Sequence, residues 1–452
     1  MSGRFEDHVA TAILGMDTLW GGDVMNPSGL GRFIADSWFS DAPLPAAYTH
    51  PAAARLRETG GVSAKVPDRA ALDAYLGGVD VRGAIAALAA DAQGMPGLRG
   101  RYVAGLALSF EVMWDLAMEL LGQGEPVPYE RCVRASTGLP PTPSDPAEKR
   151  RRVRELLAEA GFPSSGDTDL LAAVDAWRGV RAVPMASVRS VGAAYIARYA
   201  ALAERHLRPH LPEELREVPM DNIEFLPIKD AWFSGSMNYL GRARRPGGRP
   251  EYEATYEINA SLEITVPEFE QLVTHEVVPG HVTTFAFLQN LYWRGQVGFE
   301  ASVLTMNTRA ATLFEGIANN AILIAHGVAE VDQIPDPDLR IGLLLALLQD
   351  DAKNQASYLT WQAGAAEAEV APMLRRDFLV SEERAAKFAG PWGRHPLMGR
   401  MYLPCYRAGT DLVARLLRTH PPERLFPVLY GCAGLVDATT IEAALAEAER
   451  GA

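Results

Sequence analysis

The sequence predicts a mainly α-helical protein that carries one small antiparallel β-sheet. Long segments place apolar residues at the three- and four-residue spacing of amphipathic helices. By contrast, residues 222–266 combine aromatic and β-branched residues with near-alternating polarity, which is the pattern of strands. The chain has 452 residues, of which 48% are hydrophobic and 22% charged. This composition is typical of a soluble globular protein with a large core.

Five segments show the clearest helical patterns. Residues 98–124 have a helical apolar repeat that ends in glycine, and residues 145–162 begin with Asp-Pro and continue as a basic amphipathic body. Residues 187–211 form a long amphipathic segment closed by a proline. Residues 340–362 and 437–450 are the remaining strong helix predictions.

Two breaks rich in proline and glycine separate these patterns, "STGLPPTPSDP" at 136–146 and "RRPGGRPE" at 244–251. The second break lies between the segments 222–240 and 250–266, which predict a small antiparallel sheet with a hairpin. The sheet would stand directly before a segment that contains two histidines. We therefore expect the sheet to lie against that segment.

The breaks also indicate how the chain is organised. Residues 1–140 are predicted to form an N-terminal helical region, and residues 141–218 a helical segment that packs on the remainder. Residues 219–452 would hold the catalytic part with the small sheet. We expect the three parts to form one continuous compact unit.

Charge and cysteine content exclude several classes of protein. The net charge of −13 argues against a nucleic-acid-binding surface, and the basic stretch 242–249 has the composition of a solvated loop. Cys132, Cys405 and Cys432 form no CxxC pair, so neither a disulfide framework nor a thiolate zinc site is indicated. The N-terminus is a poor secretory signal and no long apolar run appears. These features predict a cytoplasmic protein without membrane or nucleic-acid partners.

The stretch "HEVVPGH" differs by two residues from the H-E-x-x-H pattern of zinc hydrolases. In a regular helix His275 and His281, six positions apart, would point about 120° away from each other. Pro279 disfavours a continuous helix and Gly280 adopts conformations closed to other residues. A helix that bulges or breaks directly before His281 would bring the two imidazoles together. Glu276 would then act as general base toward a water activated by the metal.

A catalytic zinc usually has three protein ligands, so a further carboxylate is expected. Glu300 and Glu315 both follow the histidines, and their spacing does not decide between them. Their surroundings favour Glu315, because it lies among apolar helical residues where an unpaired carboxylate is costly to bury. Gly316 would allow the histidine-bearing helix to approach closely. Asn319, one turn further on, is expected to hydrogen-bond the ligand or the substrate.

These motifs carry a family resemblance. "HEVVPGH", followed by "LFEG" and later by "LPCYRAGTDLVARLL", resembles the bacterial domain-of-unknown-function 885 family, which is marked by HExxPGH and grouped with gluzincin-type zinc metallopeptidases. The resemblance covers residues 231–417 clearly. It implies a large helical zincin-like fold with His275, His281 and Glu315 as ligands of one zinc ion, and Glu276 as base.

The sequence also departs from the family pattern. Members commonly have a histidine at the position of Val282, an EGWAxY sequence where this chain reads "EGIANNAIL", and a further histidine in the stretch that corresponds to residues 327–394. These differences indicate a conserved metal core with altered surroundings for the substrate.

Further residues are candidates for the substrate site. The resemblance makes Tyr406 the donor to the oxyanion that develops on a carbonyl under attack. Arg309 is expected to bind a substrate carboxylate or to pair with a buried acid. Tyr239 and Asn238 are expected to line the cleft on a strand edge. His395 is a candidate for the pocket, with a surface loop as its alternative.

Three functions fit this sequence. The first is a zinc-dependent hydrolase of amide bonds in small peptides or amino-acid conjugates. The second keeps the metal, zinc or another divalent ion, in a pathway enzyme that acts on a non-peptide metabolite by hydrolysis, lyase chemistry or cyclisation. The third is a helical binding protein with a degenerate site. Metal content separates the third function from the first two.

Overall fold

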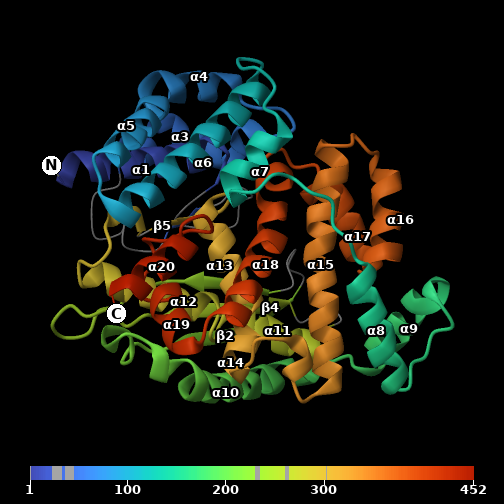
Figure 1. Cartoon of the computed structure of the whole chain (residues 1–452). Coiled ribbons are helices and arrows are strands. Elements are labelled where there is room, and N and C mark those ends of the chain that lie inside the picture. Colours follow the sequence, from blue (N-terminus) through green and yellow to red (C-terminus); the bar gives the residue numbers. More distant parts are fainter. Residues whose placement is uncertain are drawn as a thin grey trace.

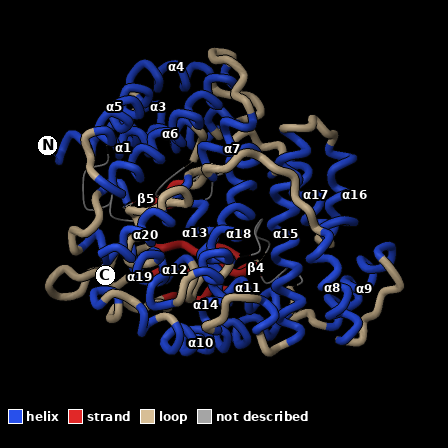
Figure 2. The backbone as a smooth tube through the Cα atoms, viewed as in Figure 1, coloured by secondary structure: helices blue, strands red, loops and turns tan. Residues whose placement is uncertain are grey.

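The computed structural model (Figure 1) is mainly α-helical with small β-sheets, as the sequence predicts. Figure 2 shows helices surrounding the strands near the centre of the molecule. The structure describes residues 2–22, 33–35, 45–229, 235–259, 264–301 and 303–451.

The N-terminal part is a layer of helices (Figure 1, blue to teal). α6 fills most of the predicted segment 98–124 and is stopped by Gly122, whose φ of 69° lies in the left-handed region that favours glycine. The helices of this layer are α1 (Ser2–Leu19), α2 (Ala46–Thr49), α3 (Pro51–Thr59), α4 (Arg69–Gly78), α5 (Val81–Gln93), α6 (Gly97–Leu121) and α7 (Tyr129–Thr137).

A second group of helices packs around its own hydrophobic cluster, which includes Trp177, Leu344 and Phe378. These side chains come from segments far apart in sequence, so the helices of residues 141–218 bury their apolar faces against later ones. The group consists of α8 (Ala147–Glu159), α9 (Asp167–Val180), α15 (Pro337–Trp361), α16 (Glu367–Phe378) and α17 (Glu382–Lys387).

The remaining helices surround the sheet and share a large hydrophobic cluster with the N-terminal layer. α12 is buried continuously from Val282 to Leu291, as expected of a central helix. This group contains α10 (Val188–His206), α11 (Val266–Glu276), α12 (His281–Trp293), α13 (Arg309–Asn319), α14 (Ala321–His326), α18 (Leu403–Thr419), α19 (Pro422–Leu429) and α20 (Ile441–Gly451).

The predicted antiparallel sheet is a mixed sheet, which corrects the expectation. β2 (Ile223–Ile228), β3 (Gly235–Tyr239) and β4 (Ala254–Asn259) lie in the order β2-β4-β3, with β3 antiparallel and β2 parallel to β4. β2 and β3 are consecutive in the sequence but lie on opposite sides of β4, and alternating polarity does not reveal this order. The parts of the predicted strand segments at 230–234 and 260–263 lie outside the described residues.

Two short strands form a separate antiparallel pair. β1 (Phe33–Ala35) pairs with β5 (Val303–Thr305), so that Phe33 lies opposite Thr305. The pair joins the N-terminal layer to the segment that leads into α13.

α13 and α18 approach each other closely at two glycines. A Cβ atom at Gly316 would lie 2.2 Å from the carbonyl oxygen of Gly409, and one at Gly409 would lie 2.0 Å from that of Thr312. Gly316 therefore makes room for α18 and not for the histidine-bearing helix, contrary to the expectation. This contact sets α13 against the helix that carries the C-terminal tyrosines.

The described residues include no helix that is both long and apolar enough to cross a membrane.

Candidate metal centre

The helix that carries the first histidine is fixed at its start. The side chain of Thr265 accepts a hydrogen bond from the Glu268 backbone N–H at 3.3 Å. Pro267 stands in the first turn, where its missing N–H costs nothing, and Glu268 interacts favourably with the positive end of the helix. These residues begin α11 ten positions before His275 (275 − 265).

The helix breaks where the Pro-Gly pair predicts a break. α11 ends at Glu276, and α12 begins at His281 after the cis peptide bond that precedes Pro279. A Cβ atom at Gly280 would lie only 1.9 Å from the carbonyl oxygen of His275. Only glycine lets the chain turn this close to the end of α11.

The break brings three side chains together. The rings of His275 and His281 lie with centroids 4.7 Å apart and nearly perpendicular planes. Nε2 of His275 is 3.7 Å from Oε2 of Glu315, and Nε2 of His281 is 3.8 Å from Oε1. One ligand atom of each residue lies within 4.8 Å of the others. The predicted convergence of the histidines is confirmed, and Glu315 joins them.

Glu300, the alternative third ligand, is occupied elsewhere. It is fully buried and accepts two hydrogen bonds from the Arg99 guanidinium, at 2.6 and 3.0 Å. This paired geometry leaves the carboxylate no role in the cluster. Of the two candidates, the structure brings Glu315 to the histidines.

The cluster fits a zinc ion by its donors and by one atom left without a partner. Buried Oε2 of Glu315 has no hydrogen-bond partner among the described residues. Two imidazoles and one carboxylate are a common catalytic zinc set, and tetrahedral ligands about 2.1 Å from an ion lie about 3.4 Å apart. The observed separations of 3.7 and 3.8 Å are close to this spacing.

Burial sets the protonation of these ligands. It lowers the pKa of His281 to about 4, and burial together with the neighbouring His281 and Lys353 holds the pKa of His275 well below its usual range. Both imidazoles are therefore neutral near pH 7, as ligation requires. Burial raises the pKa of Glu315 to about 7, against the opposing hydrogen bond from Tyr402. A bound cation would favour its ionised form.

Glu276 lies beside the cluster at the edge of the sheet. Burial, followed by the charge of Glu315, raises the pKa of Glu276 to about 8, while the Met237 backbone N–H and Lys353 oppose the rise. β3 is an edge strand, and its Met237 N–H points to this carboxyl group. Glu276 is thus held as a proton acceptor of raised basicity next to a strand edge.

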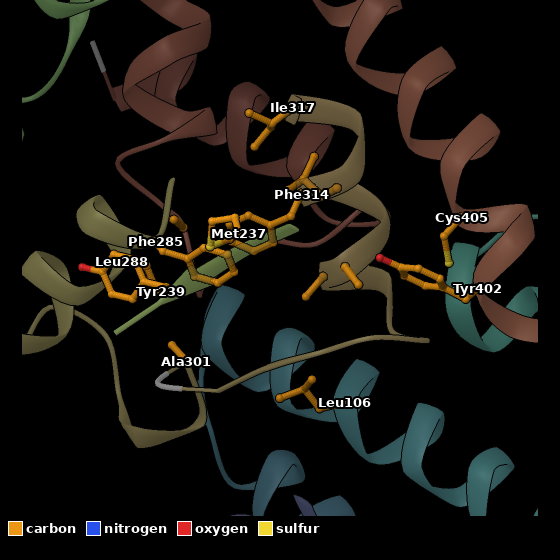
Figure 3. Packing of buried hydrophobic residues seen from close by; sticks show 14 of the residues in the cluster. Leu106, Met237, Tyr239, Phe285, Leu288, Ala301, Phe314, Ile317, Tyr402 and Cys405 are labelled. Atoms are coloured by element: carbon orange, nitrogen blue, oxygen red, sulfur yellow. The ribbon is translucent and has the colours of Figure 1, made fainter. Parts of the chain in front are cut away.

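Tyr402 was missed by the sequence prediction. Its hydroxyl donates a hydrogen bond to Oε1 of Glu315, and Figure 3 shows it directed at α13. This bond is made to Oε1, which also lies 3.8 Å from Nε2 of His281, while Oε2 faces His275. The spacing of Tyr402 and Tyr406, one helical turn apart, is the signal that would have found it.

Asn319 connects the cluster to a buried polar network. It hydrogen-bonds the side chain of His275 and donates to Asp350 and Thr410 at 2.9 and 2.8 Å. Lys353 donates to Asp350 at 3.1 Å. Asn319 therefore contacts His275 and not Glu315, the ligand that the sequence had indicated for it. Asp350 and Lys353 are buried, but they stand in the polar stretch 349–357, so the sequence pattern did not single them out.

Tyr406 lies near the cluster, as the resemblance implies. Its ring is 5.1 Å from that of Tyr402, and the ammonium group of Lys353 lies 3.3 Å from its centroid. Burial, and then the charge of Glu315, holds the pKa of Tyr406 well above its usual range. The hydroxyl therefore stays protonated near neutral pH.

The other predicted substrate residues lie against different partners. Tyr239 is buried and donates to Gln289 at 2.6 Å, and Asn238 lies 3.5 Å from Thr255 on the next strand. The edge of β3 reaches the cluster through the Met237 backbone instead.

Arg309 and His395 also lie outside the cluster contacts. Arg309 begins α13 and lies 3.4 Å from the Arg134 carbonyl oxygen of α7. His395 accepts hydrogen bonds from the backbone N–H groups of Leu397 and Met398, at 3.2 and 3.1 Å, and so caps the turn that precedes α18.

Comparisons with known proteins place this fold without naming a function. No model of a known protein family matches the sequence, and no curated protein matches it. A solved structure described as "the putative lipoprotein from Colwellia psychrerythraea" is similar, with a TM-score of 0.52 and 13% identity over 82% of this chain and 70% of that one. A "putative lipoprotein of unknown function from Shewanella oneidensis" has a TM-score of 0.48 and 13% identity over 91% and 80%. The first likeness shows a shared fold.

Proposed function

We propose that the protein is a zinc-dependent hydrolase that cleaves an amide-type bond in a small peptide or amino-acid conjugate. The observation that carries the proposal is the convergence of His275, His281 and Glu315, with Glu276 beside them. These three residues would hold the zinc ion, which supplies polarisation of a carbonyl and a lowered pKa of water when bound. The HExxPGH resemblance supports the same reading.

The side chains and backbone around the cluster would supply proton transfer, stabilisation of the oxyanion and positioning of the substrate. Glu276 takes the proton of the attacking water and returns it to the leaving amine, for which its raised basicity is suited. Tyr406, kept protonated, donates to the oxygen on which negative charge develops. β3, an edge strand of the described sheet, would offer backbone groups to an extended substrate.

Metal analysis and one variant test the proposal. Protein purified without chelators should contain about one zinc ion per chain, and it should release amines from a panel of dipeptides and N-acyl amino acids. The Glu276→Gln variant should keep the metal and lose activity about 10²- to 10⁴-fold, because it removes only the general base. A wild-type protein without bound metal, or a Glu276→Gln variant with full activity, would contradict the proposal.

A further inference from the structure

A cavity of about 420 Å³ lies beside α11, between this helix and α15 and α17. Glu268 and Leu272 of α11 line it, and Glu276 follows on the same face one turn later. Tyr406 and Lys353 also line the cavity. The cavity therefore adjoins the cluster on the side of the general base.

Two lysines line this cavity, each held over an aromatic ring. The ammonium group of Lys353 lies 3.3 Å from the ring centroid of Tyr406, and that of Lys387 lies 4.2 Å from the ring centroid of Trp392. Both rings line the same cavity. The aromatic faces fix the positions of the two cations without neutralising their charge.

The arginines of the cavity are already bound to other groups. Arg384 donates to Glu268 and Gln349. Arg178 donates to the Leu379 carbonyl oxygen at 2.8 Å and to Asp175 at 3.3 Å. Arg384 thus joins α17 to α11 and α15, and Arg178 joins α9 to the end of α16.

The acids that line the cavity are Glu268, the partner of Arg384, and Glu382 and Glu383 of α17. Glu382 and Glu383 are exposed; burial lowers the pKa of Lys387, and the charge of Glu383, one turn before it, opposes this shift. Asp350, the hydrogen-bond partner of Lys353, also accepts hydrogen bonds from Asn319 and Thr410. The charge of Asp350 is therefore shared among three donors, and Lys353 keeps N–H groups for a further acceptor.

The use of lysine here is unusual for this chain. Lysine accounts for five of its 43 basic residues, at positions 65, 149, 229, 353 and 387, so arginine is the ordinary choice. Two of the five line the same cavity. A lysine is a compact charge on a flexible stem and suits a monodentate contact to an anion in a confined space.

We propose that Lys353 and Lys387 form a subsite for a carboxylate group of the substrate, beside the Glu276 end of the metal cluster. The inference rests on the proposed function and narrows its substrate class to amides that carry a free carboxylate, such as N-acyl amino acids and short peptides.

Binding of a matched pair of probes tests the subsite without relying on turnover. Calorimetry with N-acetyl-L-alanine and its neutral N-methylamide, on zinc-loaded Glu276→Gln protein, should show tighter binding of the carboxylate. Adding the Lys387→Gln substitution to this protein should weaken binding of the carboxylate probe about tenfold and leave binding of the neutral amide unchanged. The Lys387→Arg substitution at the same position should keep most of the affinity for the carboxylate probe. Lys65→Gln, which removes an exposed lysine elsewhere, is the matched control.

Two results would overturn the subsite. One is equal affinity for the two probes, and the other is carboxylate binding that Lys387→Gln leaves unchanged. The same titrations on chelator-treated protein separate this inference from the proposed function. Carboxylate binding that depends on Lys387 in the metal-free protein supports the subsite even where hydrolysis is absent.

Discussion

Glu300 lies in a short turn against α6, whereas Glu315 lies within α13 against two histidines, and both side chains are buried. The guanidinium of Arg99 pairs with both oxygens of Glu300. Glu315 instead faces neutral imidazoles, and one of its oxygens has no partner in the described part of the chain. The difference distinguishes a carboxylate that completes the fold from one arranged to receive a cation.

Removing each carboxylate in turn gives the largest expected contrast. Glu315→Ala should lower zinc affinity by about 10³-fold or more, because it deletes one of three ligands. Glu300→Ala should leave zinc affinity unchanged. The measurement is competition with a chelating dye at fixed pH, with circular dichroism as the check on folding. Metal loss in Glu300→Ala but not in Glu315→Ala would reverse the assignment.

Removing the arginine should affect stability and not metal binding. Arg99→Ala leaves the buried Glu300 carboxylate unpaired and should lower the free energy of unfolding by about 3–5 kcal/mol. Arg101 lies two positions after Arg99 in the same helix and forms a half-exposed ion pair with Glu447. Its replacement, Arg101→Ala, should lower the free energy of unfolding much less. Urea denaturation compares the two variants. Equal losses in the free energy of unfolding would show that the Arg99–Glu300 pair stabilises the fold no more than the exposed Arg101–Glu447 pair does.

The hydrogen bond from Tyr402 sharpens the contrast at the Glu315 side. Tyr402→Phe keeps the ring but removes the donor, so zinc affinity should fall about tenfold. Tyr75→Phe removes a buried donor to the Ala47 carbonyl oxygen in the N-terminal layer and should leave zinc affinity unchanged. Unchanged zinc affinity in Tyr402→Phe would show that the hydrogen bond from Tyr402 to Glu315 does not contribute to metal binding.

The smallest expected effect is a pH dependence of the metal-free protein. Raised pKa values of about 8 for Glu276 and about 7 for Glu315 mean that the folded state holds protons that the unfolded chain has lost. The lowered pKa values of the histidines act in the opposite sense, but only below about pH 6.5. Between pH 6.5 and 8, stability should therefore fall as pH rises.

Urea denaturation across this pH window measures the effect. The fall should be shallower in Glu276→Gln, which cannot ionise at that position, and it should also be reduced in the zinc-loaded protein. Stability that rises with pH in the metal-free wild type would contradict the raised carboxyl pKa values.

Local chemistry made much of the fold and the cluster predictable. Helical spacing indicated α6, α8, α10, α15 and α20, since apolar periodicity is a property of a single segment. The Pro-Gly pair predicted the break that brings His275 and His281 together, because its steric effect acts within one turn. The preference for Glu315 over Glu300 followed from the cost of burying a carboxylate among apolar residues.

Contacts between distant segments were not predictable in this way. The strand order β2-β4-β3 and the pairing of Arg99 with Glu300 depend on where the chain returns. Likewise, the one-turn spacing of Tyr402 and Tyr406 indicates that the two side chains share a face, but not that the Tyr402 hydroxyl meets Glu315. Such features depend on tertiary contacts between residues far apart in sequence, which the local pattern of one segment does not contain.

The two facing glycines, Gly316 and Gly409, have a consequence for how the site can move. The backbones of α13 and α18 are in contact at these glycines, which leaves no space for one helix to shift against the other. The two helices should therefore move as one rigid body. Glu315, Tyr402 and Tyr406 would then keep their spacing during any opening of the site. A zinc ion held by His275 of α11 and Glu315 of α13 would tie α11 to this body as well, so we expect the metal-bound cluster to keep its geometry during any such motion.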